Sequence, residues 1–352
     1  MCEKIKPFSF EKLEKQLFRN KRDGQNIISY YKEKIEYLRK SNHIGTAGIY
    51  ELALKSFMFF VISKKKKNVK WFKNLEEAES IVPAIYFSQI DVRWLNDYEN
   101  FVINDLGNSP TSVSINTRTL RTIFNTAIEE KEIDAELYPF GKNKYQPHNV
   151  KSVKKAFTKN ELSVLYNAVP QNEEQAKAKD FWFFSYSCNG MNMKDIALLK
   201  FENLRNDTLT YYRAKTINTA KTDLRPIIVH LTVFSLEVIK IYSNADTDDD
   251  NYIFPIISVS DDNETKFRKI NNFIRFVNQH IKVLAKANGL TTDISTYWAR
   301  HSFATNAVRM GASMEFVSEA LNHHDMKTTQ GYFAGFEEES KKEMAEKLMN
   351  FD

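Results

Sequence analysis

The spacing of apolar side chains predicts helices for most of the first part of the chain. Apolar positions recur every three to four residues in four segments, and polar residues, glycine or proline bound them. The segments are residues 26–40, 46–63, 92–105 and 112–130. The last two are separated by Gly107–Pro110, a run that breaks helices. We therefore expect a helical domain here.

A different pattern follows. Residues 208–231 contain two runs of alternating β-branched and aromatic side chains around a polar turn, which is typical of a β-hairpin. Thr158 and Glu161 have the spacing of a helix capping box. The final segment, KKEMAEKLMNFD, predicts an amphipathic helix. The expected fold class is mainly α with a small antiparallel β-sheet.

The length of the chain and a segment without a periodic apolar face predict two domains. A chain of 352 residues exceeds what one hydrophobic core usually organises. We expect a short leader at 1–20, a helical domain at 21–137 and a second domain with a C-terminal helix at 156–352. Residues 138–155 are basic, contain prolines and lack a periodic apolar face, so they predict a linker between the domains.

Composition favours an intracellular protein with no membrane partner. Cys2 and Cys188 are far apart and match no disulfide or metal pattern. The first residues, MCEKIKPFSF, carry charges and are not a signal peptide. The apolar run at 57–63 is too short to span a bilayer and predicts a buried helix.

The charge of the chain is unevenly distributed. Residues 1–155 carry 27 Lys and Arg against 19 Asp and Glu, a net +8, whereas residues 156–352 carry 23 against 26, a net −3. Affinity for phosphates depends on where cations lie rather than on their sum. The densest cluster is a candidate DNA contact, with a solvated loop as the alternative. It consists of Lys64, Lys65, Lys66 and Lys67.

Three residues with phosphodiester chemistry lie close together near the end of the sequence. Arg300 opens an apolar helical run, His323 follows a helix that ends at Leu321, and Tyr332 comes nine residues later. A phosphodiester repels nucleophiles, so an enzyme must neutralise its oxygens, and a guanidinium suits this task. A tyrosine phenol can attack and become covalently joined to the phosphate. Such chemistry requires no metal or nucleotide cofactor.

The segments ARHSFAT (299–305) and SEALNHHDMKTTQGYF (318–333) resemble the C-terminal motifs of tyrosine recombinases of the phage-integrase family. The matching positions are Arg300, His301, Phe303, Ala304, Thr305, Leu321, His323, Thr328, Thr329 and Tyr332. The resemblance implies that Tyr332 is the nucleophile and that Arg300 and His323 stabilise the phosphate. It also implies a helical core-binding domain of the SAM-like type, followed by a mixed catalytic domain.

The sequence departs from this family pattern at three positions. Tyr297 stands where a histidine is usual, and Asn322 replaces a glycine. In the first family box, residues 185–204, Asn192 occupies the arginine position. Integrases of the Bacteroidetes type often look like this chain, with GMN in the first box and YWARH in the second. We expect a replacement for the missing cation from Asn192 itself, Tyr297 or Lys194.

The resemblance also assigns roles outside these boxes. A lysine in the predicted hairpin would act as general acid; Lys215 fits best, and Lys221 is the alternative. In the helical domain, the segment from Ser114 to Arg121 is the candidate DNA-facing surface. Its side chains at helical spacing are Asn116, Thr117, Arg118 and Arg121.

The implied function is site-specific DNA recombination through a 3′-phosphotyrosyl intermediate, for integration and excision or inversion of a mobile element. The implied partner is double-stranded DNA, bound by a homotetramer of subunits that are monomers when free, with a DNA-bending accessory protein. The expected location is the bacterial cytoplasm, at the nucleoid. One alternative is a DNA-binding regulator that has lost cleavage, because Asn192 and Tyr297 replace charged or titratable residues. The other is an enzyme similar to type IB topoisomerases.

Overall fold

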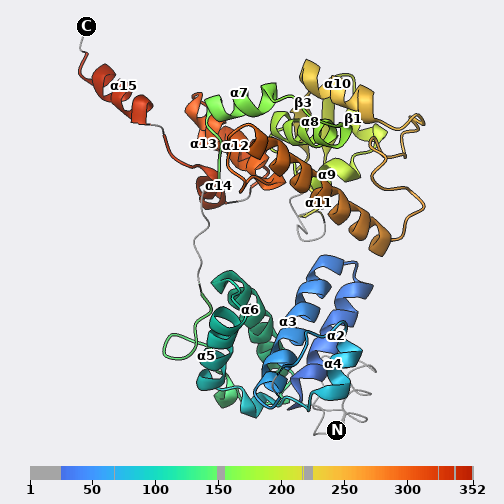
Figure 1. Ribbon diagram of the computed structural model, residues 1–352, viewed down its shortest axis with the longest axis vertical. Helices are drawn as coiled ribbons and strands as arrows, with labels where there is room; N and C mark the ends of the chain where they lie inside the picture. Colours follow the sequence, from blue (N-terminus) through green and yellow to red (C-terminus); the bar gives the residue numbers. More distant parts are fainter. Residues whose placement is uncertain are drawn as a thin grey trace. The chain divides into compact units, whose positions relative to one another are not determined.

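The computed structural model describes residues 25–66, 68–148, 155–215, 217, 225–323, 325–336 and 338–350. The chain divides into two units, residues 1–151 and 152–352 (Figure 1). Each unit has a hydrophobic core of its own. The predicted leader, residues 1–20, lies outside the described residues.

The first unit is helical, as the apolar spacing predicts. Its helices are α2 (Ile27–Lys40), α3 (Ile44–Ser63), α4 (Leu75–Ile81), α5 (Val92–Asn100), α6 (Pro110–Glu129), and the short η3 (Phe87–Gln89), η4 (Phe101–Asp105) and η5 (Ala135–Leu137). Side-chain oxygens of Asn26, Asn74, Asp91 and Ser109 cap the N-termini of α2, α4, α5 and α6. The four predicted helices are confirmed, and the third continues into η4, a π-helical turn.

Helix α3 forms the centre of this core. Leu54, Phe57 and Met58 have no exposed surface, and α3 packs against α2 and α6. By length and composition α3 could cross a membrane, since its most apolar window has a mean hydropathy of 1.3, but 56% of that window is buried within the protein. The prediction of a buried helix at 57–63 is therefore confirmed.

The predicted linker is in large part a piece of the first unit. Phe140 and Tyr145 are buried in its core. The Tyr145 hydroxyl donates to Glu99 at 2.7 Å, and His148 contacts the other oxygen of Glu99 at the same distance. Apolar periodicity could not indicate this, because these aromatic residues pack from an irregular loop. The prediction that the linker begins at residue 138 is therefore wrong in this respect.

The second unit contains nine described α-helices and a small sheet. The helices are α7 (Lys159–Asn167), α8 (Glu173–Ser187), α9 (Met193–Leu198), α10 (Val233–Tyr242), α11 (Asn263–Ala287), α12 (Thr296–Arg309), α13 (Met314–Ala320), α14 (Met326–Tyr332) and α15 (Glu338–Leu348). Helix α8 packs against both α11 and α12. Its Trp182 is fully buried and donates its indole N–H to the Ser295 carbonyl at 3.0 Å, beside the start of α12.

The start of this unit is tied to α12. The predicted capping box is confirmed, because the Glu161 amide donates to the Thr158 hydroxyl and Glu161 accepts from the Thr158 amide. Just before it, the Phe157 amide donates to the Ser302 hydroxyl at 3.0 Å, and the Asn306 amide group donates to the Phe157 carbonyl at 3.1 Å. Both partners lie on α12, which is thereby fixed at the centre of the unit.

The sheet has three antiparallel strands, β1 (Leu204–Arg205), β2 (Thr208–Tyr211) and β3 (Ile227–His230), in the order β1-β2-β3. Leu209 pairs with Val229, and both side chains are buried. The two predicted strands of the hairpin are confirmed, whereas residues 216 and 218–224 of their connection lie outside the described residues. The fold class, mainly α with a small antiparallel sheet, is confirmed.

Candidate active site

Arg300 is the buried centre of the candidate site. It lies on the second turn of α12 and is 2% exposed. Its Nη1 donates to the Gly190 carbonyl at 3.0 Å and its Nη2 to the Leu321 carbonyl at 2.6 Å. Because both acceptors are neutral, they orient the guanidinium and leave its charge for an anionic ligand.

Gly190 is required where the first box meets α12. Its φ is +65°, and a Cβ at this position would lie 2.7 Å from the Cα of Arg300. A side chain here would therefore meet backbone as well as an unfavourable conformation. The glycine of the first box thus allows Arg300 to reach its carbonyl acceptor.

His323 lies beside Arg300 in a neutral form. The Arg300 guanidinium can only donate, so the His323 Nε2 at 3.3 Å accepts, and Nδ1 donates to the Thr329 hydroxyl at 3.0 Å. Burial, followed by the positive charges of Arg300, Arg213 and Lys215, lowers the pKa of His323 to about 3. His324, the neighbour in the sequence, lies outside the described residues.

Tyr332 ends α14 and packs among the other motif residues. Its side chain is 8% exposed. The ring centroid lies 5.0 Å from that of His323 and 5.6 Å from the Arg300 guanidinium carbon. The Tyr332 carbonyl accepts from the Thr305 hydroxyl of α12 at 3.2 Å. The three residues selected from the sequence are therefore brought together by α12, α14 and the loop after α13.

Tyr297 and His301, one turn apart on α12, complete the surroundings of the phenol. The hydroxyls of Tyr297 and Tyr332 share a hydrogen bond, and the His301 ring lies 4.6 Å from the Tyr332 ring between centroids. Burial, and then the hydrogen bond to Tyr332, raises the pKa of Tyr297. Burial is also the main cause that lowers the pKa of His301. Tyr297 is thus in contact with Tyr332.

Asn192 immediately precedes α9, and its side chain makes no capping hydrogen bond to that helix. Its amide group donates to Asp195 Oδ2 at 3.4 Å, and Asp195 Oδ1 accepts from the Ala214 amide at 2.9 Å. Asp195 is 5% exposed, and burial raises its pKa against the opposing effect of these donors and of Arg213. Lys194, named above as a possible replacement cation, is exposed.

The hairpin places two positively charged residues near the site: Lys215, which the sequence predicted, and Arg213, which it did not. Lys215 is exposed and close enough to contribute to the low pKa of His323; Lys221 lies outside the described residues. Arg213, two residues before Lys215, is only 8% exposed. The sequence could have indicated that Arg213 is buried, because side chains in an extended strand alternate between its two faces. Leu209, Tyr211 and Arg213 therefore share the inner face.

Only some of the candidate DNA-facing side chains on α6 are exposed. Arg118 and Arg121 are exposed. Thr117, however, is fully buried and donates its hydroxyl to the Val113 carbonyl at 2.8 Å. Asn116 is half-buried and donates to the Tyr98 hydroxyl at 2.7 Å. The inclusion of Thr117 was wrong, because its side chain points into the core.

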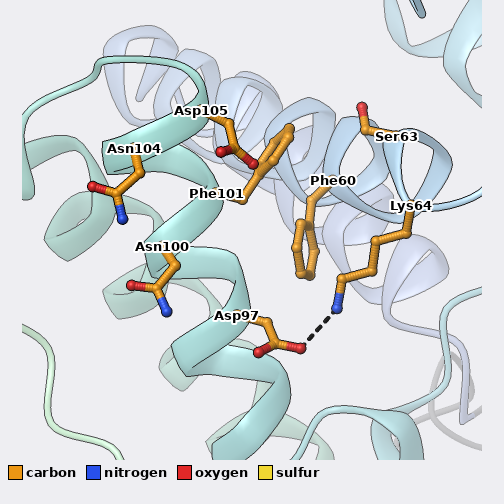
Figure 2. Close-up of a pocket in the computed structure, with 8 residues that line it drawn as sticks. All are labelled: Phe60, Ser63, Lys64, Asp97, Asn100, Phe101, Asn104 and Asp105. Carbon is orange, nitrogen blue, oxygen red and sulfur yellow. Dashed lines mark hydrogen bonds and ion pairs between the residues drawn. The ribbon is translucent and has the colours of Figure 1, made fainter. Parts of the chain in front are cut away.

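Lys64 of the lysine cluster borders an acidic cavity of about 320 Å³ (Figure 2). Its ammonium group is paired with Asp97 at 2.9 Å and lies 4.4 Å from the centre of the Phe60 ring. Asp105 also lines this cavity. Lys64 is therefore partly neutralised, whereas Lys65 and Lys66 are exposed; Lys67 lies outside the described residues.

The site has the groups that phosphoryl transfer requires. A phenol lies beside a buried guanidinium and a neutral imidazole, which can act on an attacking oxygen and on the negative phosphate oxygens. In the described part of the chain, no three His, Cys, Asp or Glu side chains are grouped as metal ligands would be. Fold and site together are those of a class of phosphoryl-transfer enzymes in which a tyrosine lies beside a buried arginine and a histidine.

Comparison with known proteins identifies the family. Residues 26–146 match the family model "Phage integrase SAM-like domain", and residues 155–339, more than half of the chain, match the model "Phage integrase family". The chain belongs to the phage integrase family. It is a tyrosine recombinase, and its activity is site-specific DNA recombination.

The chain is similar to Xer recombinases along much of its length. It is 24% identical to the tyrosine recombinase XerA of Thermococcus onnurineus over 227 residues, which cover 64% of this chain and 71% of the relative. It is 36% identical to XerD of Listeria monocytogenes over 74 residues, 18% of this chain and 25% of that protein.

Solved structures share the fold. XerH recombinase, in a post-cleavage complex with palindromic difH substrate, aligns over 88% of this chain and 83% of its own, with a TM-score of 0.56 and 16% identity. The Tn1549 transposon integrase, in complex with transposon right end DNA, aligns over 84% of this chain and 100% of its own, with a TM-score of 0.52 and 13% identity. At these identities the likeness concerns the fold alone.

Proposed function

We propose that the chain cleaves and rejoins double-stranded DNA through a 3′-phosphotyrosyl intermediate on Tyr332. The observation that carries this proposal is the packing of the Tyr332 ring against both the Arg300 guanidinium and the His323 ring, at 5.6 and 5.0 Å. A nucleophile and its charge-stabilising groups then act on one phosphate without large rearrangement.

The roles follow from the donors and acceptors. The phenol of Tyr332 loses its proton to His323, and its oxygen forms a bond to phosphorus as the bond to the 5′ oxygen breaks. Lys215 gives a proton to that 5′ oxygen. Arg300 stabilises the charge on the non-bridging oxygens, whereas His323 presents an acceptor nitrogen, Nε2, and acts as a base. The reverse attack by a 5′ hydroxyl of another strand releases Tyr332, so the cycle consumes no cofactor.

Two further site residues have supporting roles in this proposal. Tyr297 orients Tyr332 through the hydrogen bond between their hydroxyls. Asn192 holds Asp195 at the base of the site. Neither residue carries a positive charge, so neither can replace a guanidinium on the phosphate.

The proposal extends to the assembly on DNA. Four subunits, monomers when free, would act on two duplexes, together with a DNA-bending accessory protein. The cytoplasm of a bacterium, at the nucleoid, is the place where such a substrate lies. The biological outcome would be integration and excision, or inversion, of a mobile element.

The test is covalent trapping on a nicked suicide substrate that carries the junction sequence of the element encoding this chain. Wild type should give a DNA-linked, slowly migrating band on a denaturing gel, and Tyr332→Phe should give none while still binding the duplex. Tyr332→Phe removes one oxygen, so its folding should be preserved. Tyr297→Phe is the control: it keeps the nucleophile and should form the band more slowly.

Two results would overturn the proposal in different ways. Specific DNA binding without a covalent band in the wild type would favour the regulator that has lost cleavage, to which the neutral Asn192 points. Relaxation of supercoiled DNA without preference for a site would favour an activity similar to type IB topoisomerases.

A further inference from the structure

The first box, residues 185–204, contributes no positively charged side chain beside Arg300 at the position of Asn192. Asn192 supplies a neutral amide, and that amide is already engaged with Asp195. Arg300 donates through Nη1 and Nη2 to two carbonyls that fix its position. In the transition state of phosphoryl transfer, negative charge is spread over two non-bridging oxygens, and preorganised cations there contribute most of the stabilisation.

Arg213 is a buried cation at the edge of this site. It follows β2, and burial alternates from Leu209 through Tyr211 to Arg213, so its side chain continues the inner face of the strand. A buried arginine on the inner face of a sheet is uncommon. Only 8% of it is exposed, which suits a residue that belongs to a site.

One short segment holds both arginines. The Gly190 carbonyl accepts from Arg300 at 3.0 Å, and five residues later Asp195 accepts from the Ala214 amide at 2.9 Å. Ala214 is the residue next to Arg213 in the chain. The first box thus fixes Arg300 directly and the backbone of Arg213 through Asp195.

The positive charge of Arg213 acts on both Arg300 and His323. Burial, followed by Arg213, lowers the pKa of Arg300. The positive charge of Arg213 also contributes, after burial and Arg300, to the low pKa of His323. Two like charges in a region of low exposure repel each other, and an anion placed between them relieves this cost.

We propose that Arg213 is a catalytic residue that binds a non-bridging oxygen of the scissile phosphate opposite Arg300. It supplies the second guanidinium that the first box, with Asn192 at the arginine position, does not contain. Asp195 is then a positioning residue, since it holds the backbone at Ala214. The inference rests on the proposed cleavage by Tyr332.

The other candidates for the missing charge are less well placed than Arg213. Lys194 is exposed on the first turn of α9. Tyr297 is neutral, 47% exposed and bonded to the Tyr332 hydroxyl. Lys215 is exposed and is required as the proton donor in the proposed reaction.

The experiment measures the rate of covalent adduct formation on the suicide substrate for Arg213→Ala and Arg213→Lys. Arg213→Ala should slow the reaction by about 10²–10³-fold, the usual effect of losing one preorganised donor. Arg213→Lys should recover part of the rate, because it restores the charge but not the planar fork. Arg205→Ala is the matched control in the same sheet: it is exposed and paired with Asp249, and its rate should match that of the wild type.

A second substrate separates a role on the phosphate from a defect in folding. Replacing one non-bridging oxygen of the scissile phosphate by methyl removes the charge that Arg213 would neutralise. On this methylphosphonate, Arg213→Ala should form the adduct less than about tenfold more slowly than the wild type. Lys215→Ala should be slowed, relative to the wild type, by the same factor as on the natural substrate.

The outcomes distinguish this inference from the function on which it rests. If the wild type forms an adduct that depends on Tyr332 but Arg213→Ala is within threefold of it, the role of Arg213 is refuted and cleavage stands. An equal defect of Arg213→Ala on both substrates would also refute the role, since a structural defect is indifferent to phosphate charge. If the wild type forms no adduct on either substrate, the proposed function itself is refuted.

Discussion

At the scale of single residues, the site depends on one close approach of backbone. Gly190 and Gly289 both have positive φ, +65° and +72°, but only the Cβ added at Gly190 would meet another atom, the Arg300 Cα at 2.7 Å. We expect Gly289→Ala to cost about 1–2 kcal/mol of folding free energy from backbone conformation alone. Gly190→Ala should cost at least about 1 kcal/mol more and should also slow cleavage, because Arg300 must shift.

The comparison of these two alanine variants isolates the contact. Urea unfolding measures the stability of each, and adduct formation on the suicide substrate measures activity. Gly289→Ala should cleave at the rate of the wild type. Equal stability and equal activity for the two variants would show that the approach to Arg300 has no consequence.

His323 should affect stability at acidic pH. Its pKa is lowered to about 3, chiefly by burial and then by Arg300, whereas in an unfolded chain it is about 6.5. Between these values the unfolded chain binds a proton that the folded protein does not, so stability falls as the pH decreases below about 6.5. His323→Gln should remove part of this acid-induced loss.

Two measurements check the behaviour of His323. Urea unfolding of the wild type and of His323→Gln at pH 7 and pH 5 gives the difference in stability. NMR of the imidazole, assigned with the same variant, should show no titration between pH 5 and 8 in the free protein. A titration midpoint near 6.5 would contradict the neutral form and the tautomer inferred from its contacts.

The sequence predicted these residues unevenly, for physical reasons. Arg300, His323 and Tyr332 could be found because they lie in a short segment with characteristic spacing, and the structure brings them together. Arg213 was missed because the hairpin was interpreted through its lysines, although strand alternation places it inside. Thr117 was wrongly assigned to the surface, because helical spacing shows which residues share one side of a helix but not whether that side is buried.

At the scale of elements, α6 carries the proposed contact of the first unit with DNA. Thr117 is buried, and the exposed candidates on α6 that carry a positive charge are Arg118 and Arg121. Each phosphate contact adds about 0.9 to the slope of log affinity against log salt concentration. The double variant Arg118→Gln, Arg121→Gln should therefore weaken binding and reduce the slope by about two.

The control for α6 is Thr122→Ala, an exposed position on the same helix with no charge. Binding of a fluorescent duplex between 50 and 200 mM salt gives both slopes. Thr122→Ala should leave affinity and slope unchanged. An unchanged slope in the double arginine variant would remove α6 from the proposed DNA surface.

At the scale of the whole molecule, the two units divide between residues 151 and 152, inside the predicted linker 138–155, but the first part of that linker belongs to the core of the first unit. Length gave the number of domains, and apolar periodicity gave the helices of the first. Periodicity does not register aromatic side chains that pack from a loop, and Phe140 and Tyr145 do so. The first unit therefore continues through residue 148, and the second is already packed at Phe157.

This boundary predicts how the two units fold when they are separated. Fragments 25–148 and 155–350 each retain a complete described core, so each should unfold cooperatively by itself. A fragment that begins at residue 160 should be less stable than 155–350 by at least about 3 kcal/mol. It loses Phe157, which is fully buried and joined to Ser302 and Asn306, and also the Thr158 cap.

Thermal unfolding of the three fragments, followed by circular dichroism, measures the difference. Because Ser302 and Asn306 lie on α12 with Arg300, loss of Phe157 should also loosen the site, and amide exchange along α12 should be faster in the shorter fragment. Phe157→Leu within 155–350 keeps the backbone hydrogen bonds and should have a smaller effect on exchange. Equal exchange in both fragments would mean that the contacts of α12 with other helices of the unit are sufficient to hold it.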